Sequence, residues 1–175
     1  MTMKFKPFDK KSISATRVGW QNDAENGGGF LPDLEQSLDW AESHIELVEN
    51  SMAYGVFQDG LSAAIGICEL VITKRSSRSK WLKVLRLRLG PKTESGLFSN
   101  DPKAVKVAID AYITCVVGVF HVKNEHKATT IKVYGRTQEQ VRFLATLAAA
   151  MQASKLETTF KSSIEGRWLV LSWGK

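Results

Sequence analysis

Residues 81–91 read WLKVLRLRLGP, and this stretch decides how the rest of the chain is interpreted. Side chains alternate along 81–89, which is typical of a β-strand, and Gly-Pro ends the alternation. The even positions begin apolar and become basic at Arg86 and Arg88, while the odd positions are apolar except for Lys83. We expect the two arginines to bind a phosphate or an acidic substrate, or to lie on an exposed sheet face, where they could pair with carboxylates.

Two further strands are predicted directly before this one. Residues 52–57 and 61–73 are rich in β-branched and apolar residues, and the Asp59-Gly60 pair between them is a strong hairpin signal. The basic segment 74–80, KRSSRSK, is interpreted as the next hairpin turn. Three consecutive antiparallel strands are therefore expected.

Three helices are predicted from starting residues and apolar spacing. The first opens at Pro32, and its apolar face is formed by Leu34, Leu38, Ala41, Ile45 and Val48. The second begins after Asp101 as N-cap with Pro102 in its first turn, and it is apolar on nearly all sides, which predicts deep burial. The third covers 137–152, where Thr137 and Gln140 have capping-box spacing.

The remaining segments complete the expected order. Residues 1–31 are polar and glycine-punctuated, so we expect an irregular N-terminal arm with at most a short edge strand at 12–18. Residues 129–135 are predicted as a strand, and 156–162 and 167–173 as two strands joined by a turn. From 32 the order is helix, three strands, helix, strand, helix and two strands, which indicates a single domain over 32–175.

The composition constrains the partners more than the chemistry. A formal net charge of +6 and a pI near 9.4 suit a phosphate-bearing cofactor, a nucleic acid or an acidic surface, and equally a solvated surface without an anionic ligand. Cys68 and Cys115 lie in apolar runs and are expected to be buried thiols. Histidines and cysteines show no metal-binding spacing, and no phosphate-loop, dinucleotide or hydrolase motif is present.

The cellular location is expected to be cytoplasmic. The first residues, MTMKFKPFDKK, lack the apolar core of a signal peptide, and the longest apolar stretches are interpreted as shorter than a membrane span. No contact with a membrane is expected.

The element order and three local patterns resemble the GNAT superfamily of acyl-CoA-dependent N-acyltransferases over residues 32–174. The patterns are the strand end LGP at 89–91, the segment VYGRTQEQVRFL at 133–144, and the final GRWLVLSW. The resemblance implies an α+β, GNAT-like fold: a mixed, mostly antiparallel twisted sheet of six to seven strands with helices on both faces. It also implies transfer of an acyl group from acetyl-CoA or another acyl-CoA to an unknown amine.

The resemblance implies a cofactor site at the end of the 81–89 strand. Its residues would be Arg86, Leu87, Arg88 and Leu89, together with Gly96 in the segment that follows. Family members usually carry Arg/Gln-x-x-Gly-x-Gly/Ala there, and its backbone N–H groups hold the pyrophosphate. Here only Gly96 remains, and the expected loop is acidic, so the phosphate motif is degenerate.

The catalytic groups that the resemblance implies are also incomplete. Aligning the last helix puts Phe143 or Leu144 where the family has a tyrosine acid, so Tyr134 is the substitute. Glu69 is the candidate general base, while His121 and His126 lie beyond the second helix.

Two other functions stay open. The first is a catalytically inactive member of the same fold that binds a protein or forms a homodimer, with the last strand and its Trp168 and Trp173 as the interface. The second is a nucleic-acid-binding protein that uses a basic stripe over 74–88, although only Trp81 offers a stacking ring there.

Overall fold

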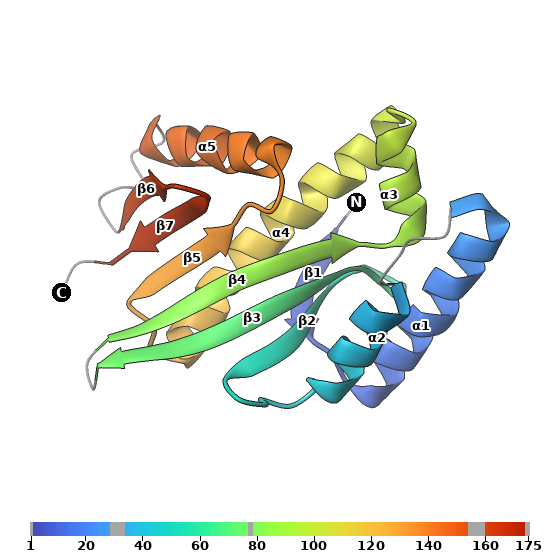
Figure 1. The fold of residues 1–175 in the computed structure, drawn as a ribbon, viewed down its shortest axis with the longest axis horizontal. Helices are drawn as coiled ribbons and strands as arrows, with labels where there is room; N and C mark the ends of the chain where they lie inside the picture. Colours follow the sequence, from blue (N-terminus) through green and yellow to red (C-terminus); the bar gives the residue numbers. More distant parts are fainter. Residues whose placement is uncertain (1, 29–33, 77–78, 154–159, 174–175) are drawn as a thin grey trace. The chain divides into compact units, whose positions relative to one another are not determined.

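The computed structural model describes residues 2–28, 34–76, 79–153 and 160–173 (Figure 1). Along the chain the elements are β1 (Met3–Pro7), α1 (Lys10–Asp23), a π-helical turn (Ala24–Gly28), α2 (Leu34–Ser43), β2 (Ser51–Gln58), β3 (Ala64–Ser76), β4 (Ser79–Leu89), α3 (Pro91–Phe98), α4 (Pro102–Glu125), β5 (Thr130–Tyr134), α5 (Gln138–Ala153), β6 (Lys161–Glu165) and β7 (Trp168–Ser172). The strands form a seven-stranded mixed sheet in the order β1-β2-β3-β4-β5-β7-β6. The predicted α+β class and the strand meander are confirmed.

The chain divides into two compact units, and each is built from two separate pieces of sequence. Unit 1 consists of Met1–Glu69 and Leu87–Gly118, and unit 2 consists of Leu70–Arg86 and Val119–Lys175. Strands β3 and β4 and helix α4 contribute residues to both units.

The start of unit 1 corrects the prediction of an irregular arm over 1–31 with an edge strand at 12–18. Strand β1 pairs antiparallel with β2, and the next segment is helix α1. Asp9 and Ser12 form a reciprocal capping box: Asp9 Oδ1 accepts from the Ser12 N–H at 2.7 Å, and Ser12 Oγ accepts from the Asp9 N–H at 2.9 Å. The buried face of α1 has helical spacing but is half polar, which is why hydrophobicity alone missed it; its residues are Ser12, Ile13, Thr16 and Trp20.

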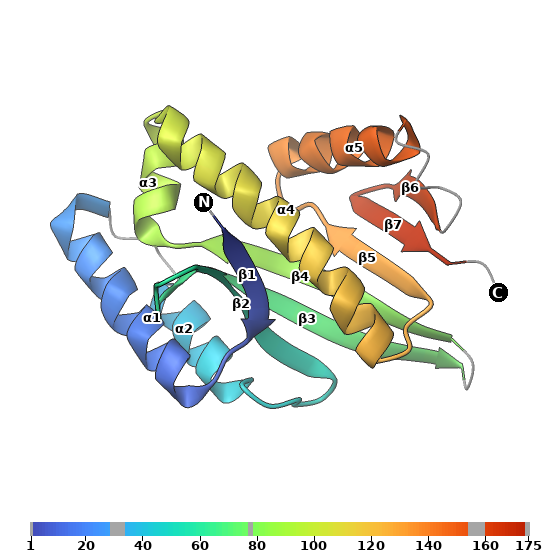
Figure 2. The same cartoon turned by 180° about the vertical axis from the view of Figure 1, so that it is seen from behind.

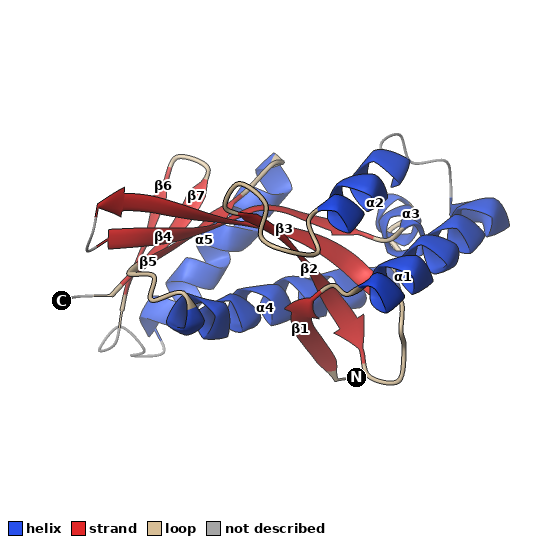
Figure 3. Cartoon of the chain, turned by 90° about the horizontal axis from the view of Figure 1, so that it is seen from below, coloured by secondary structure: helices blue, strands red, loops and turns tan. Residues whose placement is uncertain are grey.

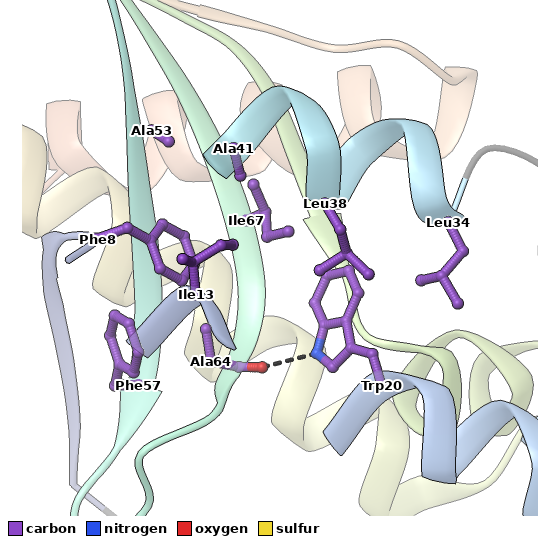
Figure 4. Close-up of a cluster of buried hydrophobic side chains, with 10 residues drawn as sticks. All are labelled: Phe8, Ile13, Trp20, Leu34, Leu38, Ala41, Ala53, Phe57, Ala64 and Ile67. Atoms are coloured by element: carbon purple, nitrogen blue, oxygen red, sulfur yellow. Dashed lines mark hydrogen bonds between the residues drawn. The ribbon is translucent and has the colours of Figure 1, made fainter. Parts of the chain in front are cut away.

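A hydrophobic core joins α1 and α2 to one face of the strands in unit 1. Figure 4 shows it; its members are Phe8, Ile13, Trp20, Leu34, Leu38, Ala41, Ala53, Phe57, Ala64 and Ile67. Helix α2 ends at Ser43, so Ile45 and Val48 do not extend its apolar face as predicted, and Pro32 lies outside the described residues.

Three carboxylates also connect α2 to α1 through one guanidinium. Arg17 Nη1 donates to Glu35 Oε2 at 2.6 Å, and its Nη2 donates to Asp39 at 2.8 Å and Glu42 at 2.9 Å. Because the Arg17 side chain is only 24% exposed, these contacts are less screened by solvent than an ordinary surface pair.

Helix α4 packs on the opposite face of the strands in unit 1. Cys68 follows the core residue Ile67 on β3, and its Sγ lies 3.6 Å from Sγ of Cys115 on α4. Because successive strand residues point to opposite faces, α4 and the α1–α2 pair cover opposite faces, as Figures 2 and 3 show. Both cysteines are buried, as predicted, and burial raises the pKa of the Cys68 thiol well above its ordinary value.

The outward side of α4 differs from the predicted deep burial on all sides. Four β-branched residues four positions apart are 38–53% exposed: Val105, Ile109, Ile113 and Val117. Helix α4 also has the length and apolar composition that a membrane-spanning helix requires, with a mean hydropathy of 1.7 over its most apolar window, although core helices of soluble proteins pass the same test. The sequence interpretation therefore underestimated this apolar run.

Unit 2 contains the parallel pair of the sheet. Strand β5 runs parallel to β4 and antiparallel to β7, and β6 pairs antiparallel with β7 at the edge. One face of these strands is deeply buried through Leu82, Val84, Ile131, Val133, Leu169 and Leu171. The predicted strands at 129–135 and 167–173 are confirmed. Of the predicted strand at 156–162, residues 156–159 lie outside the described residues.

Candidate functional site

The candidate site is built on the end of strand β4, where it leaves its parallel neighbour. The β4–β5 ladder runs from Trp81–Thr130 to Val84–Val133, but β4 itself continues to Leu89. The Gly90 N–H donates to the Ile65 carbonyl of β3 at 2.9 Å, so position 90 faces β3. Because backbone groups in an antiparallel pair alternate between the two edges, positions 87 and 89 direct theirs to the edge where β5 has ended.

In unit 2, strand pairing and one ring contact identify which residues of β4 point toward α4. Leu82 lies beside Ile131, which pairs with Leu171. Trp173 follows on the same side of that chain, and its ring lies 5.4 Å from the ring of Phe120 on α4, centroid to centroid. Even-numbered residues of β4 therefore point toward α4 in this unit.

In unit 1, by contrast, it is the odd-numbered residues of β4 that point toward α4. Arg88 Nη1 donates to Ser37 Oγ of α2 at 3.0 Å, so Arg88 faces α2. Leu87 and Leu89 then face the α4 side. The α4-facing residues are thus even-numbered as far as Val84 and odd-numbered from Leu87, which indicates one extra residue, a β-bulge, between them. Strict alternation along the strand, as read from the sequence, does not hold.

Trp20 fixes the point at which β4 ends. Its indole Nε1 donates to the Ala64 carbonyl at 2.8 Å, and the side chain is 2% exposed. A Cβ built on Gly90 would lie 2.8 Å from the same Nε1, so a side chain there requires the indole to move. Glycine at position 90 is therefore a packing requirement as well as the N-cap of α3.

The segment expected to be a polar loop is helix α3. Pro91 occupies its first turn and has no N–H, and the Thr93 and Glu94 N–H groups both donate to the Gly90 carbonyl at 3.0 Å. A Cβ on Gly96 would lie 2.4 Å from Cβ of Ala104 on α4, so this glycine allows α3 to approach α4. The structure gives Gly96 a packing role, and the cofactor role inferred from the resemblance stays a prediction.

At the start of α4, backbone N–H groups are likewise bonded within the helix and to its N-cap. Asp101 Oδ1 accepts from the Lys103 N–H at 3.0 Å, as the N-cap prediction expected, and the Asp101 carbonyl accepts from the Val105 N–H. Pro102 removes another donor. At the starts of α3 and α4, a proline without an N–H and bonds within the helix therefore leave fewer free N–H donors for a phosphate.

The two arginines of the opening stretch have different environments. Arg88 is half-buried against α2 and bonded to Ser37, which is 1% exposed. Its guanidinium therefore lies on the α2 side of β4. Arg86 is half-buried and belongs to unit 2.

The candidate catalytic residues also fall in different units. Glu69 is half-buried on β3 in unit 1. Tyr134 ends β5 in unit 2, where its ring lies 4.8 Å from the Trp168 ring and 5.7 Å from the Arg167 guanidinium. Within unit 1, Leu87, Arg88 and Leu89 follow one another on β4, and Trp20, whose role the sequence reading missed, lies against Gly90 at the end of that strand.

Other predicted site positions contribute structure. On α5, Leu144 is 2% exposed and Phe143 is half-buried, and His121 is exposed on α4. Trp173 packs with Phe120 and Phe160, and Lys123 Nζ lies 4.0 Å from its ring centroid. Within the described ranges, no three histidine, cysteine, aspartate or glutamate side chains gather as a metal site would need.

Comparisons with known proteins gave matches among solved structures only. No family model and no curated protein matches this chain. The chain is similar to a chain of the NatC complex bound to Gag peptide and CoA (11% identity, TM-score 0.47, covering 99% of this chain and 100% of that one). It is also similar to an acetyltransferase from Thermus thermophilus (14% identity, TM-score 0.47, 97% and 96% covered).

A third match is a GNAT family acetyltransferase from Brucella melitensis in complex with acetyl-CoA (9% identity, TM-score 0.47, 99% and 90% covered). This third neighbour bears the name of the family that the sequence resembles. With TM-scores below 0.5, the three neighbours carry no weight in the functional argument, which rests on the geometry of this chain.

Proposed function

We propose that this protein is an N-acyltransferase that takes the acyl group from an acyl-CoA thioester and gives it to an amine. The observation that carries the proposal is the end of β4, which continues to Leu89 after its ladder with β5 stops at Val84. Positions 87 and 89 direct backbone N–H and C=O groups to that edge. An extended ligand with amide groups of its own, such as the pantetheine arm of CoA, can add to such an edge like a further strand.

The chemistry needs a polarised carbonyl and two proton transfers. A backbone N–H at position 87 or 89 would donate to the thioester oxygen and stabilise the negative charge that develops there when the amine attacks. Glu69, in the same unit as this edge, is the proposed acceptor of the amine proton. Tyr134, which the resemblance implies as donor to the leaving thiolate, belongs to unit 2, and its role stays a prediction from the sequence. Arg88, on the α2 side, is proposed to bind an acidic group of the amine substrate, with Arg86 assisting.

The pyrophosphate end of CoA fits less well. Pro91, Pro102 and Asp101 occupy the helix starts where its N–H donors would be, and Glu94 adds negative charge. The arm should therefore supply most of the affinity. We expect acetyl-pantetheine to bind within about tenfold of acetyl-CoA, a difference of at most about 1.4 kcal/mol.

Calorimetry with acetyl-CoA, a longer acyl-CoA and acetyl-pantetheine tests this directly. Leu87→Pro removes the N–H at the proposed edge and should weaken binding of all three about tenfold or more. Leu87→Ala is the matched control because it removes the side chain and keeps the N–H. Circular dichroism establishes that both variants are folded. Absence of heat at millimolar acyl-CoA would exclude the enzyme.

A second candidate function, an inactive module that forms a homodimer, is favoured by the exposed side of α4. Val105, Ile109, Ile113 and Val117 form one ridge at i, i+4 spacing. Two copies of such a ridge interdigitate at a crossing angle of about −50°, the commonest class of helix packing. The last strand is a poorer candidate, since Trp168 and Trp173 pack against other rings.

Light scattering distinguishes this candidate. The unaltered protein should have twice the mass of one chain, and Ile113→Glu should return it to a monomer while Lys106→Glu, next to the ridge, should leave the dimer weakened by no more than a few-fold. A monomer at all concentrations that turns over acyl-CoA would exclude the homodimer and leave the enzyme.

A further inference from the structure

The second face of unit 2 gathers aromatic and cationic side chains. Lys83 pairs in register with Lys132, and Tyr134 pairs with Trp168. Trp81 lies two residues before Lys83 on β4, so its side chain points the same way. These five residues, Trp81, Lys83, Lys132, Tyr134 and Trp168, are called the aromatic–basic face.

This face lies opposite the buried side of unit 2. The alternate residues Leu82, Val84, Ile131 and Leu169 are at most 2% exposed, whereas all five members of the aromatic–basic face are of intermediate exposure. In Figure 1, which looks onto it, no helix of unit 2 crosses in front of β4 and β5. The five side chains are therefore partly open to solvent, although Val170, which pairs with Lys132 on the same face, is only 6% exposed.

Each aromatic group of the face has a cation beside it. Lys132 Nζ lies 4.3 Å from the centroid of the Trp81 ring and Lys83 Nζ lies 5.7 Å from it. On the second group, the Arg167 guanidinium lies 5.7 Å from the Tyr134 ring centroid. The Trp81 ring and the Tyr134 ring, at two places along β5, thus each have a cation nearby.

The face and its immediate neighbours carry more positive than negative charge. Lys83 and Lys132 belong to the face, and Arg167 lies beside it; the carboxylate in contact is Glu165, which pairs with Lys132 Nζ at 3.1 Å. Lys132 is 15% exposed on its side chain, so its position is fixed by packing as well as by the ion pair. An anionic ligand would complete the charges of the cluster.

We propose that the aromatic–basic face binds single-stranded nucleic acid. Bases stack on rings and phosphates pair with the neighbouring cations, and only a single strand exposes base planes and phosphates together. The positions of Trp81 and Tyr134 are separated by four residues of β5, since Trp81 pairs with Thr130. Four steps along a strand measure about 13 Å, which suits two bases with one nucleotide between them.

Other partners use less of this surface. A duplex keeps its base planes inside the stack and would contact the cations alone. An acidic protein segment would likewise pair with the lysines without needing two aromatic groups. Tyr134 is also the predicted acid of acyl transfer, but the variants that test nucleic-acid binding change Trp81 and Lys83, so the two activities are tested separately.

Fluorescence anisotropy with a labelled 12-nucleotide uridine or thymidine oligomer tests the proposal. We expect binding that falls steeply between 50 and 200 mM salt. Lys83→Glu should weaken it about tenfold or more and reduce the salt slope by about one to two. Trp81→Leu should weaken it about fivefold to a hundredfold, the value of one stacked base, with little change in slope.

The controls decide between this site and general attraction to a basic protein. Lys11→Glu, on exposed α1 in unit 1, changes the net charge by the same amount and should alter affinity less than twofold. Equal weakening by Lys11→Glu, tighter binding of the duplex, or competition by poly-glutamate at the same charge concentration would each overturn the proposal. Should Trp81→Leu fail to fold, ultraviolet crosslinking gives a separate readout: crosslinks must map to the peptides of β4 or β5, and mapping elsewhere contradicts the face.

Discussion

Replacing Trp20 with alanine is expected to lower the free energy of unfolding by about 3–5 kcal/mol. The indole is 2% exposed at the centre of the unit 1 core, so its removal leaves a large cavity. The Ala64 carbonyl loses its buried donor as well. Urea unfolding followed by circular dichroism measures the change.

Trp20→Phe separates the two contributions, because it keeps an aromatic ring and removes the N–H. We expect a loss of about 1–3 kcal/mol, the cost of a buried acceptor without its donor together with some lost packing. Val18, on the same helix, is 55% exposed, and Val18→Ala should change stability by less than about 0.5 kcal/mol. A Trp20→Ala effect as small as that of Val18→Ala would contradict the described core.

The same variant bears on the proposed acyl-CoA site. Gly90 packs against the indole, so the end of β4 loses its support when Trp20 is removed. Trp20→Phe should therefore weaken acyl-CoA binding less than Trp20→Ala at a temperature where both are folded. Equal binding by all three proteins would mean that β4 keeps its end without the indole.

Gly96→Ala is the second substitution with a large expected effect. The new Cβ would lie 2.4 Å from the Ala104 Cβ, and two helices cannot approach that closely without shifting. Overpacking of this kind costs about 1–3 kcal/mol. Thermal or urea unfolding measures it.

Ala104→Gly supplies the compensating change. It removes the methyl group that the new side chain meets, at a helix-propensity cost of about 1 kcal/mol. The double variant should be less destabilised than the sum of the two single variants, with a coupling of at least about 0.5 kcal/mol. Additive losses would show that the helices do not meet at Gly96.

The double variant also separates packing from cofactor binding. If Gly96 serves only the contact between α3 and α4, the repaired protein should bind acyl-CoA like the original. If its backbone approaches the ligand, as the resemblance predicts, acyl-CoA binding should remain weak after stability has recovered.

The sequence predicted strands β2 to β5 and β7 well because their signals are local, whereas β1 was missed. Hairpin residues such as Asp59-Gly60 and the apolar runs of β2, β3 and β5 need no knowledge of the partner strands. The capping pair Thr137 and Gln140 on α5 was predicted from its spacing. The Gln140 N–H donates to Thr137 Oγ1 at 3.2 Å, and Gln140 Oε1 accepts from the Arg136 N–H at 2.7 Å. Local rules were sufficient for these elements.

Helices α1 and α3 were missed for different physical reasons. Helix α1 buries Ser12 and Thr16, and the Thr16 hydroxyl donates to the Ser12 carbonyl at 2.7 Å, so polar residues occupy a buried face. Helix α3 is eight residues long and its contact with α4 depends on Gly96, a residue that predicts a loop when read alone. Only tertiary contacts distinguish these cases.

The candidate site shows the same limit. Arg88 lies near the strand end, as the pattern predicted, but the face it occupies depends on the extra residue in β4. The mark of that residue in the sequence is the adjacent apolar pair Val84-Leu85, and it was not recognised. The aromatic–basic face joins Trp81 to Tyr134 and Trp168 from distant segments. These residues lie close together because β4 pairs with β5 and β5 with β7, and their separation along the sequence does not predict that pairing.

The discontinuity of the two units has a consequence for synthesis on the ribosome. Unit 1 needs Leu87–Gly118 as well as the first 69 residues, so its core cannot close until about two thirds of the chain has emerged. Meanwhile β1 and β2 can pair as soon as they are made, which leaves the other edge of β2 exposed to neighbouring nascent chains. Slow translation through α3 and α4 would prolong that exposure, and a truncated chain ending before Gly118 should aggregate rather than fold.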